Sequence, residues 1–341
     1  MMITLAEIKQ ILENKDPHFI EGLAQKAKKI TEQYFGRTIS LYTPLYLSNY
    51  CSSHCLYCGF NKKQKLKRFK LTPSQMDKEM AFLANEGIKN ILLLTGESYG
   101  ATPLSYLKEA VSIAKKYFSG ISIEMHPMQE YEYKQLFMAG VDGITIYQET
   151  YNKKRYKEVH LSGKKADYEF RLNTPERAAR AGIRNISLGI LLGLHDLAED
   201  LFSLYQHLRK LEKCYPGVEY SLSFPRLRPI KGFSLNWHHV DDLTFVKIIC
   251  MSRLAFPRTG INLSTREKPD LRDHLLGIGV TRISAGSNTS VGGYTIYKSA
   301  EQQPQFDIED NRSVKEIVQT IKKKGFDPIF TDWRRIKNES I

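Results

Sequence analysis

The sequence contains no long apolar run and few cysteines. No stretch of its 341 residues approaches the length of a membrane-spanning helix, and its N-terminus has no apolar run of signal-peptide length. The five cysteines are an odd number without a paired framework, which argues against a secreted scaffold held by disulfides. We therefore expect a cytoplasmic protein that does not enter a membrane.

The chain also has fewer acidic than basic residues. The chain has 50 Lys and Arg residues against 37 Asp and Glu residues, a formal net charge of +13. Such a charge suits phosphate binding, so an RNA-binding protein is one hypothesis. However, no helix-turn-helix, RNA-recognition or zinc-finger pattern accompanies the lysines. We expect no nucleic-acid partner and interpret the basic runs as solvated faces that attract anionic partners or reductants.

What the sequence does have is a compact group of three cysteines, Cys51, Cys55 and Cys58, spaced C-x3-C-x2-C. Iron–sulfur clusters are normally held by four thiolates, so three thiolates can hold three irons of a [4Fe–4S] cube and leave one iron open. A zinc knuckle would need a fourth local ligand, and His54 is crowded between two of the cysteines. The spacing predicts that the three cysteines are metal ligands. The rival class is an iron–sulfur electron carrier, which has little need of an open iron.

Apolar segments alternate with helical segments along most of the chain. This alternation implies parallel strands with right-handed crossovers, and eight such units close a barrel. The predicted fold class is α/β, a (β/α)8 TIM-type barrel over residues 41–335, with a helical lead-in over 1–40 and a short C-terminal extension. Strands are expected at 41–47, 90–95, 121–125, 143–147, 185–190, 219–224, 261–264 and 282–285. Helices are expected at 73–87, 103–118, 128–139, 175–181, 198–213, 241–256, 268–276 and 312–324, and a polar loop at 286–311.

Chemically useful residues follow the expected strands at one end. Such a barrel carries its chemistry at the C-terminal ends of its strands. In strand order, these residues are Cys51–Cys58, Thr95-Gly96-Glu97, Glu124, Tyr147–Thr150, Gly193, Arg226 with Arg228, Ser264–Glu267 and Ser284–Ser287. Random polar residues would not fall so regularly at one rim, so we expect a single active site there.

Several motifs resemble one enzyme superfamily and, within it, one family. The cysteine spacing, with Tyr57 before the last cysteine and Gly59-Phe60 after it, resembles the radical S-adenosylmethionine (SAM) enzymes. More specific segments resemble the 2-iminoacetate synthases, the tyrosine lyases of thiamine biosynthesis, from about Tyr42 to about Trp333. These segments are Tyr147–Tyr151, His160–Lys165, Ser223–Pro229 and Leu263–Glu267. Residues from about 240 to 335 resemble the C-terminal region of biotin and thiamine synthases.

The resemblance implies a reaction, cofactors and partners. The cofactors are a [4Fe–4S] cluster and SAM, which is cleaved to methionine and 5′-deoxyadenosine. The substrate is L-tyrosine, whose Cα–Cβ bond breaks to give 2-iminoacetate (dehydroglycine) and p-cresol. Thiazole synthase is the implied protein partner, and a flavodoxin- or ferredoxin-type protein is the implied reductant.

The resemblance also implies residues that bind the cofactor. Thr95, Gly96 and Glu97 are expected to receive the ammonium of SAM, because an ammonium only donates hydrogen bonds. Glu149 is expected at the ribose hydroxyls, and Arg171 at the SAM carboxylate, which suits a bidentate guanidinium. Gly59 is expected to let the backbone approach SAM closely. Tyr57 or Phe60 is expected to pack on the adenine, with shielding of the cluster as the alternative.

Arg266 is the candidate for the tyrosine carboxylate, and we group Ser264 and Ser284 with it as catalytic-site residues; Ser287 is an alternative to Ser284. Tyr46 is expected to contact the substrate, with core packing as the alternative. Two more arginines, Arg226 and Arg228, are expected either to polarise the phenol or to hold a loop. No histidine is assigned a catalytic role.

Two related enzyme types remain as alternatives. Hydrogenase maturases of the HydG type share the tyrosine lyase step but carry further C-terminal cysteines for a second cluster, whereas here no cysteine follows Cys250. This departure favours the 2-iminoacetate synthases. A tryptophan lyase is the more distant alternative.

Overall fold

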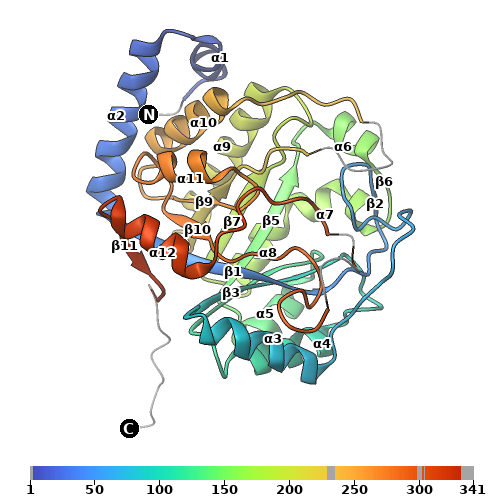
Figure 1. Cartoon of the computed structure of the whole chain (residues 1–341). Coiled ribbons are helices and arrows are strands. Elements are labelled where there is room, and N and C mark those ends of the chain that lie inside the picture. The colour runs from blue at the N-terminus through green and yellow to red at the C-terminus, as the bar shows by residue number, and fades with distance from the viewer. Residues whose placement is uncertain (1–2, 229–234, 298–301, 303, 332–341) are drawn as a thin grey trace.

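Eight parallel strands close into a barrel in the computed structural model, which describes residues 3–228, 235–297, 302 and 304–331 (Figure 1). The strands are β1 (Thr38–Ser48), β3 (Asn90–Thr95), β4 (Gly120–Glu124), β5 (Gly143–Glu149), β7 (Asn185–Ile190), β8 (Glu219–Ser223), β9 (Gly260–Leu263) and β10 (Arg282–Ser284). They pair in that order, and β10 pairs back with β1, which closes the ring. The predicted (β/α)8 barrel is confirmed.

Helices cover the outside of the barrel. They are α3 (Pro73–Asn85), α4 (Leu104–Ala114), α5 (Glu130–Ala139), α8 (Thr174–Arg180), α9 (Leu197–Cys214), α10 (Asp242–Ala255), α11 (Pro269–Leu275) and α12 (Val314–Lys323). Local chemistry sets their ends: α3 begins at Pro73, and the Thr72 side chain accepts a hydrogen bond from the backbone N–H of Gln75. Within the described residues, no helix combines the length and apolar character needed to cross a membrane.

The N-terminal lead-in is helical as predicted, with α1 (Leu5–Glu13) and α2 (Pro17–Phe35), but β1 begins at Thr38, three residues before the expected strand. Several short elements were not predicted, because they are too short to show a period. They are β2 (His54–Cys55), α6 (Lys153–Val159), β6 (His160–Ser162), the 3-10 turn η1 (Lys164–Ala166), α7 (Tyr168–Leu172) and β11 (Asp327–Ile329). The predicted barrel boundary at 335 lies outside the described residues.

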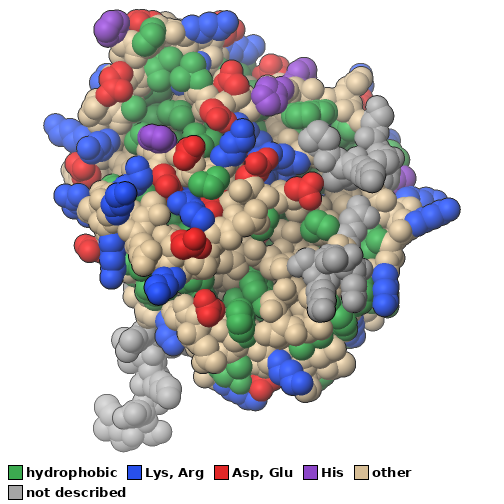
Figure 2. Space-filling model, in the orientation of Figure 1, with side chains coloured by type: hydrophobic (Ala, Val, Ile, Leu, Met, Phe, Trp, Pro, Cys, Tyr) green, Lys and Arg blue, Asp and Glu red, His purple; other side chains and the backbone are tan. Residues whose placement is uncertain are grey.

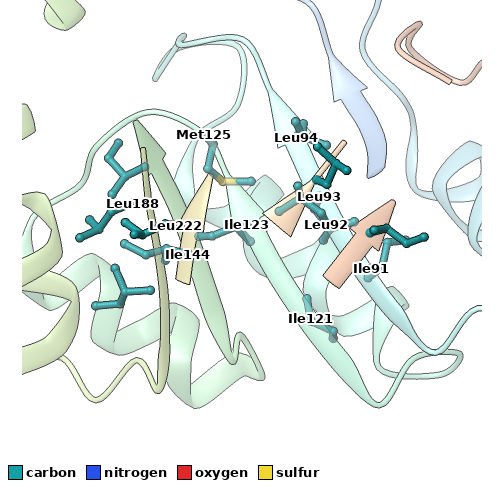
Figure 3. Packing of buried hydrophobic residues seen from close by; sticks show 14 of the residues in the cluster. Ile91, Leu92, Leu93, Leu94, Ile121, Ile123, Met125, Ile144, Leu188 and Leu222 are labelled. Carbon is teal, nitrogen blue, oxygen red and sulfur yellow. The ribbon is translucent and has the colours of Figure 1, made fainter. Parts of the chain in front are cut away.

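The core lies between the strands and the helices, and Figure 3 shows the side chains of β3, β4, β5, β7 and β8 in one cluster. In β3 the four residues Ile91–Leu94 are all buried, whereas the polar residues Asn90 and Thr95 stand at its two ends. A parallel strand covered on both faces has this continuous apolar pattern. In β3, polar side chains are thereby confined to the two ends of the strand.

Candidate active site

A cavity opens at the C-terminal end of the barrel and encloses about 1440 Å³ of empty space, part of it continuous with solvent. Of the residues to which the sequence assigned a role, all except Gly59 and Arg226 line this cavity. They include Tyr46, Cys51, Cys55, Tyr57, Cys58, Thr95, Gly96, Glu97, Glu149, Arg171, Ser264, Arg266 and Ser284. The structure therefore brings together segments that are more than 200 residues apart in the chain.

The three motif cysteines lie on the loop that follows β1. Cys55 is buried, while Cys51 and Cys58 are half-buried and, like Cys55, line the cavity. Burial, followed by the charge of Cys58, raises the pKa of the Cys51 thiol to about 11. Burial likewise raises the pKa values of the Cys55 and Cys58 thiols. A metal cluster would supply the positive charge that thiolates need in so apolar a position.

The cysteine loop is held in place on both sides. β2 pairs with β6 in a small antiparallel sheet, in which Cys55 is opposite His160. On the other side, the backbone N–H and the side-chain hydroxyl of Ser52 both donate to the carbonyl oxygen of Glu97, at 2.9 and 2.8 Å. The described residues contain no group of three His, Cys, Asp or Glu side chains arranged around a single ion. A four-iron cube distributes three thiolates over three different irons, which requires a wider arrangement than one ion does.

Four charged side chains form one group beside the cysteines. Arg171 donates to Oε1 of Glu97 at 2.7 Å and lies 3.7 Å from Oε1 of Glu149. Lys165 donates to the same Oε1 of Glu149 at 2.7 Å. Although burial alone lowers the pKa values of Arg171 and Lys165, the two carboxylates leave both raised. The sequence placed Lys165 inside a motif but assigned it no role.

The backbone at Glu149 is unusual. Its φ angle is 70°, a left-handed conformation that residues other than glycine rarely adopt. The pairing of β5 with β7 shifts register between Tyr147 and Glu149, and Arg171 Nε donates to the Tyr147 carbonyl at 2.6 Å beside this irregularity. Strained backbone of this kind concentrates at functional sites, where the surrounding structure holds it in place.

The two predicted glycines serve close contacts within the chain. A Cβ atom at Gly96 would lie 2.4 Å from the carbonyl oxygen of Tyr50, so a side chain there would push β3 away from the cysteine loop. A Cβ atom at Gly59 would lie 2.7 Å from the carbonyl oxygen of Gln305, which accepts a hydrogen bond from the Gly59 N–H. The close approach at Gly59 is therefore to the 304–305 backbone, and its expected approach to SAM stays a prediction.

Arg266 reaches the cavity from the loop after β9. Its guanidinium lies 3.7 Å from the centre of the Phe306 ring and donates to the carbonyl oxygen of Arg226 at 3.1 Å. Burial lowers its pKa, although Tyr46 and Glu267 oppose this shift. Its buried Nε atom has no partner among the described residues. Arg266 thus combines a cationic, planar group with unused hydrogen-bonding capacity.

Other residues predicted for the site form hydrogen bonds within the protein. Tyr46 donates its hydroxyl to Oε1 of Gln305 at 2.7 Å, and the Tyr57 hydroxyl lies 2.6 Å from Nε2 of His160. Ser284 accepts a hydrogen bond from the backbone N–H of Thr265 at 3.0 Å. These bonds fix the side chains in place around the cavity.

Arg226 and Arg228 hold loops, as one of the two expectations for them states, while a contact with the phenol stays a prediction. Arg226 forms ion pairs with Glu267 and Asp242. Arg228 donates to Oε1 of Glu309 at 2.6 Å and forms a further hydrogen bond to a backbone carbonyl in the loop after β9. Of the two, Arg228 lines the cavity.

Glu124, at the end of β4, is a cavity residue to which the sequence assigned no role. Burial, then repulsion from Glu149, raises its pKa to about 7, although Lys165 and Arg171 oppose this. None of the described residues forms a hydrogen bond or an ion pair with its carboxylate. Its position after a strand was the available signal, but its protonation depends on burial, which the sequence does not reveal.

Further lining residues come from the loop between β10 and α12. They are Thr289, Gln305 and Phe306, and the Nε2 of Gln305 lies 3.9 Å from the Cys58 sulfur. The loop was predicted as a polar connection in which only Ser287 had an assigned role. No motif or period marks these positions, so sequence reasoning had no means of selecting them.

Comparisons with known proteins agree with this arrangement. The radical SAM superfamily matches residues 45–208, and the Biotin and Thiamin Synthesis associated domain matches residues 223–327. The chain is 38% identical over 319 residues to 2-iminoacetate synthase of Escherichia coli (strain K12), an alignment that covers 92% of this chain and 83% of that protein.

Two solved structures of HydG, a maturase of the [FeFe]-hydrogenase, are similar over almost the whole chain. One has a TM-score of 0.90 at 33% identity and covers 97% of this chain and 74% of that chain. The other, from Carboxydothermus hydrogenoformans, has a TM-score of 0.89 at 35% identity and covers 96% of this chain and 76% of that chain.

Proposed function

The chain belongs to the 2-iminoacetate synthase family within the radical SAM superfamily, and from this premise we propose that it cleaves the Cα–Cβ bond of L-tyrosine. The products are 2-iminoacetate and p-cresol, and SAM is converted to methionine and 5′-deoxyadenosine. The 2-iminoacetate serves the thiazole ring of thiamine, and thiazole synthase is the proposed partner that receives it. The observation that carries the proposal is that the cluster thiols, the charged group around Arg171 and the guanidinium of Arg266 share one cavity.

The residues present fit a [4Fe–4S] cluster and SAM. Three buried polar atoms with no partner among the described residues belong to the cavity-lining side chains of Thr95, Glu97 and Ser287. Such atoms are costly unless a ligand pairs with them. Cys51, Cys55 and Cys58 would hold the cluster, which would supply the electron for the reductive cleavage of SAM and so the radical chemistry that removes a hydrogen atom from the amino group of tyrosine.

The charged group beside the cysteines would hold SAM at both ends. Glu97 accepts hydrogen bonds from its ammonium, Glu149 accepts from its ribose hydroxyls, and Arg171 binds its carboxylate. In the structure these side chains neutralise one another. Ligand binding therefore exchanges internal ion pairs for ion pairs with SAM, and no uncompensated charge is left buried.

Arg266 would hold the tyrosine carboxylate through its free Nε and the edge of its guanidinium. The Phe306 ring behind it keeps the guanidinium plane fixed. A fixed carboxylate aims the amino group toward SAM, and holding two reactants in one geometry lowers the barrier substantially. Tyr46 and Ser284 form other parts of the wall and exclude water around the substrate.

The decisive experiment is anaerobic incubation of the reconstituted protein with SAM, dithionite and tyrosine. p-Cresol should appear in step with 5′-deoxyadenosine, and glyoxylate should appear as the hydrolysis product of 2-iminoacetate. Tryptophan offered in place of tyrosine should yield no aromatic product. Cleavage of SAM with tyrosine but without p-cresol would refute the proposal.

The similarity to HydG makes a second function worth testing, namely further conversion to carbon monoxide and cyanide. That chemistry uses a second cluster in addition to the one proposed at Cys51, Cys55 and Cys58, so the iron content per chain distinguishes the two functions. We expect about four irons per chain and no carbon monoxide in a haemoglobin trap. About eight irons, or carbon monoxide in step with p-cresol, would favour the HydG-type reaction.

A further inference from the structure

The proposed function requires an electron from an external donor, and that donor must approach the cysteine loop from the protein surface. Cys55 is buried, but the loop itself is shallow: Ser52 is exposed and His54 is half-buried. The face of the molecule over this loop is therefore a short path to the three thiols.

The chain around this loop has basic residues but no acidic ones. No Asp or Glu occurs in the 44 residues from Gln33 to Met76, which include the cysteine motif. Just after the motif, four lysines are exposed, and we call them the lysine surface: Lys62, Lys63, Lys65 and Lys67. Figure 2 shows Lys and Arg side chains projecting at the edge of the molecule where β2 and the following loop lie.

The lysine surface is fixed relative to the cysteines. The Lys62 N–H donates to the carbonyl oxygen of Ser53 at 2.9 Å, inside the cysteine loop. Arg68 closes the segment, because its guanidinium donates to the carbonyl oxygens of Asn49, Phe60 and Asn61 at 2.6 to 2.7 Å. The charges of Lys63 and Lys65 therefore stand at a set place beside the cluster loop.

An exposed apolar side chain lies next to this charge. β6 pairs with β2, and Leu161 in the middle of β6 is 52% exposed. Two acidic residues near this strand are occupied by basic partners: Glu158 pairs with Arg155, and Glu169 pairs with Lys153. An apolar contact beside unopposed charge is the anatomy of a protein interface, with an apolar centre and a charged rim.

We propose that the lysine surface is the docking site of a small acidic protein that carries single electrons on a flavin, as a flavodoxin does, with Leu161 at the edge of the contact. One electron leaves the carrier's reduced flavin and enters the cluster, so the flavin is oxidised by one electron and the cluster is reduced by one. Opposite charges on the two faces steer the encounter and set its orientation. Because electron-transfer contacts are small and short-lived, charge contributes more to them than buried area does.

The test compares two double variants of the holoenzyme with equal changes in net charge. Lys63→Glu/Lys65→Glu alters the lysine surface. Lys28→Glu/Lys29→Glu alters exposed lysines of α2, which lies across the molecule from β2 in Figure 1. The probe is an acidic flavodoxin, and the readouts are its dissociation constant at low and high salt, its carbodiimide cross-links, and p-cresol formation driven by flavodoxin or by dithionite.

We expect Lys63→Glu/Lys65→Glu to weaken flavodoxin binding by at least about tenfold at low salt. Flavodoxin-driven turnover should fall by a similar factor, while dithionite-driven turnover should stay within about twofold, because dithionite needs no docking surface. Cross-links in the unsubstituted protein should map to Lys62, Lys63, Lys65 or Lys67. The α2 variant should match the unsubstituted protein throughout.

Several results would overturn the docking proposal. Equal weakening in both variants would show an effect of net charge alone, and cross-links confined to other lysines would place the carrier elsewhere. A variant that loses binding to a short RNA but keeps flavodoxin binding would indicate a nucleic-acid surface instead. Absence of p-cresol with dithionite would refute the tyrosine lyase reaction, but binding and cross-linking would still decide where the carrier docks.

Discussion

Arg171 and Glu97 are joined by a 2.7 Å hydrogen bond across the mouth of the barrel, although they are 74 residues apart in the chain. Arg171 belongs to α7, and Glu97 follows β3, so the bond links two segments that lie far apart in the chain. Both side chains are largely buried, with 6% and 12% of their surfaces exposed. In the proposed function they bind opposite charges of the same ligand, and in its absence they satisfy each other.

The first prediction concerns Arg171→Lys, which keeps the charge but removes the bidentate fork. SAM affinity of the reconstituted protein should fall by about 10- to 100-fold, as measured by equilibrium dialysis. The matched control is Arg180→Lys on α8, where the arginine forms half-exposed ion pairs with Glu130 and Glu176. An unchanged affinity in Arg171→Lys would mean that this arginine does not bind the SAM carboxylate.

The second prediction tests the cluster ligands. Replacement of Cys51, Cys55 or Cys58 by Ala should abolish both the visible absorbance of the reconstituted cluster and the cleavage of SAM, because a missing thiolate leaves a second iron unheld. Cys214 is exposed and lies outside the cavity, so Cys214→Ala should keep both properties. Full SAM cleavage by any of the three motif variants would contradict the assignment.

The third prediction concerns substrate orientation. Arg266→Lys should lower kcat/KM for tyrosine by about 100-fold, or about 2.7 kcal/mol, because lysine offers neither the Nε donor nor the planar fork. SAM affinity should stay within about twofold, since Arg171 remains. Arg258→Lys, at an exposed arginine over the Tyr34 ring, serves as the control. Loss of SAM binding with unchanged binding of tyrosine would show that the roles of Arg266 and Arg171 are exchanged.

The fourth prediction follows from the pKa of Glu124, which burial raises from 4.5 to about 7. Between these values the folded chain holds a proton that the unfolded chain has lost, so this group makes stability fall as pH rises through that window. Glu124→Gln removes the ionisation and should lessen the fall by up to about 3 kcal/mol between pH 5 and pH 8.

Urea unfolding of the metal-free protein at the two pH values measures this effect. The control is Glu130→Gln, at a carboxylate that is 47% exposed in its ion pair with Arg180. It should leave the pH dependence of the free energy of unfolding nearly unchanged, since exposed pairs contribute little. Identical slopes for Glu124→Gln and the unsubstituted protein would show that Glu124 ionises normally.

Much of the barrel was predictable because its signals are local. The Thr72-Pro73 start of α3 and the apolar run Ile91–Leu94 of β3 depend on neighbouring residues alone. The C-terminal ends of parallel strands meet at one edge of a barrel, and this alone predicts that Thr95–Glu97 and Ser264–Arg266 lie at one rim. The cysteine spacing was equally informative, because it places three thiols within eight residues of one another.

Other features of the site had no local signal. Gln305 and Phe306 join it from a loop without a motif, and Gly59 is required by the backbone of that same loop. Lys165 belongs to the segment His160–Lys165, yet its importance arises from its ion pairs with Glu149 and Glu97, which lie on other segments of the chain. Such pairings depend on how distant segments pack, and the sequence pattern does not specify that packing.

The sequence by itself determined the order of strands and helices, the grouping of the three motif cysteines and the rim at which the predicted site residues gather, because periodicity, capping and residue spacing are properties of short segments. Only the tertiary structure decided which charges neutralise one another, which buried polar atoms have no hydrogen-bond partner among the described residues, and how far the pKa of Glu124 is raised. The physical reason is that burial and electrostatic interaction depend on three-dimensional distance. Residues such as Arg171 and Glu97 become buried and paired with each other only when the barrel closes.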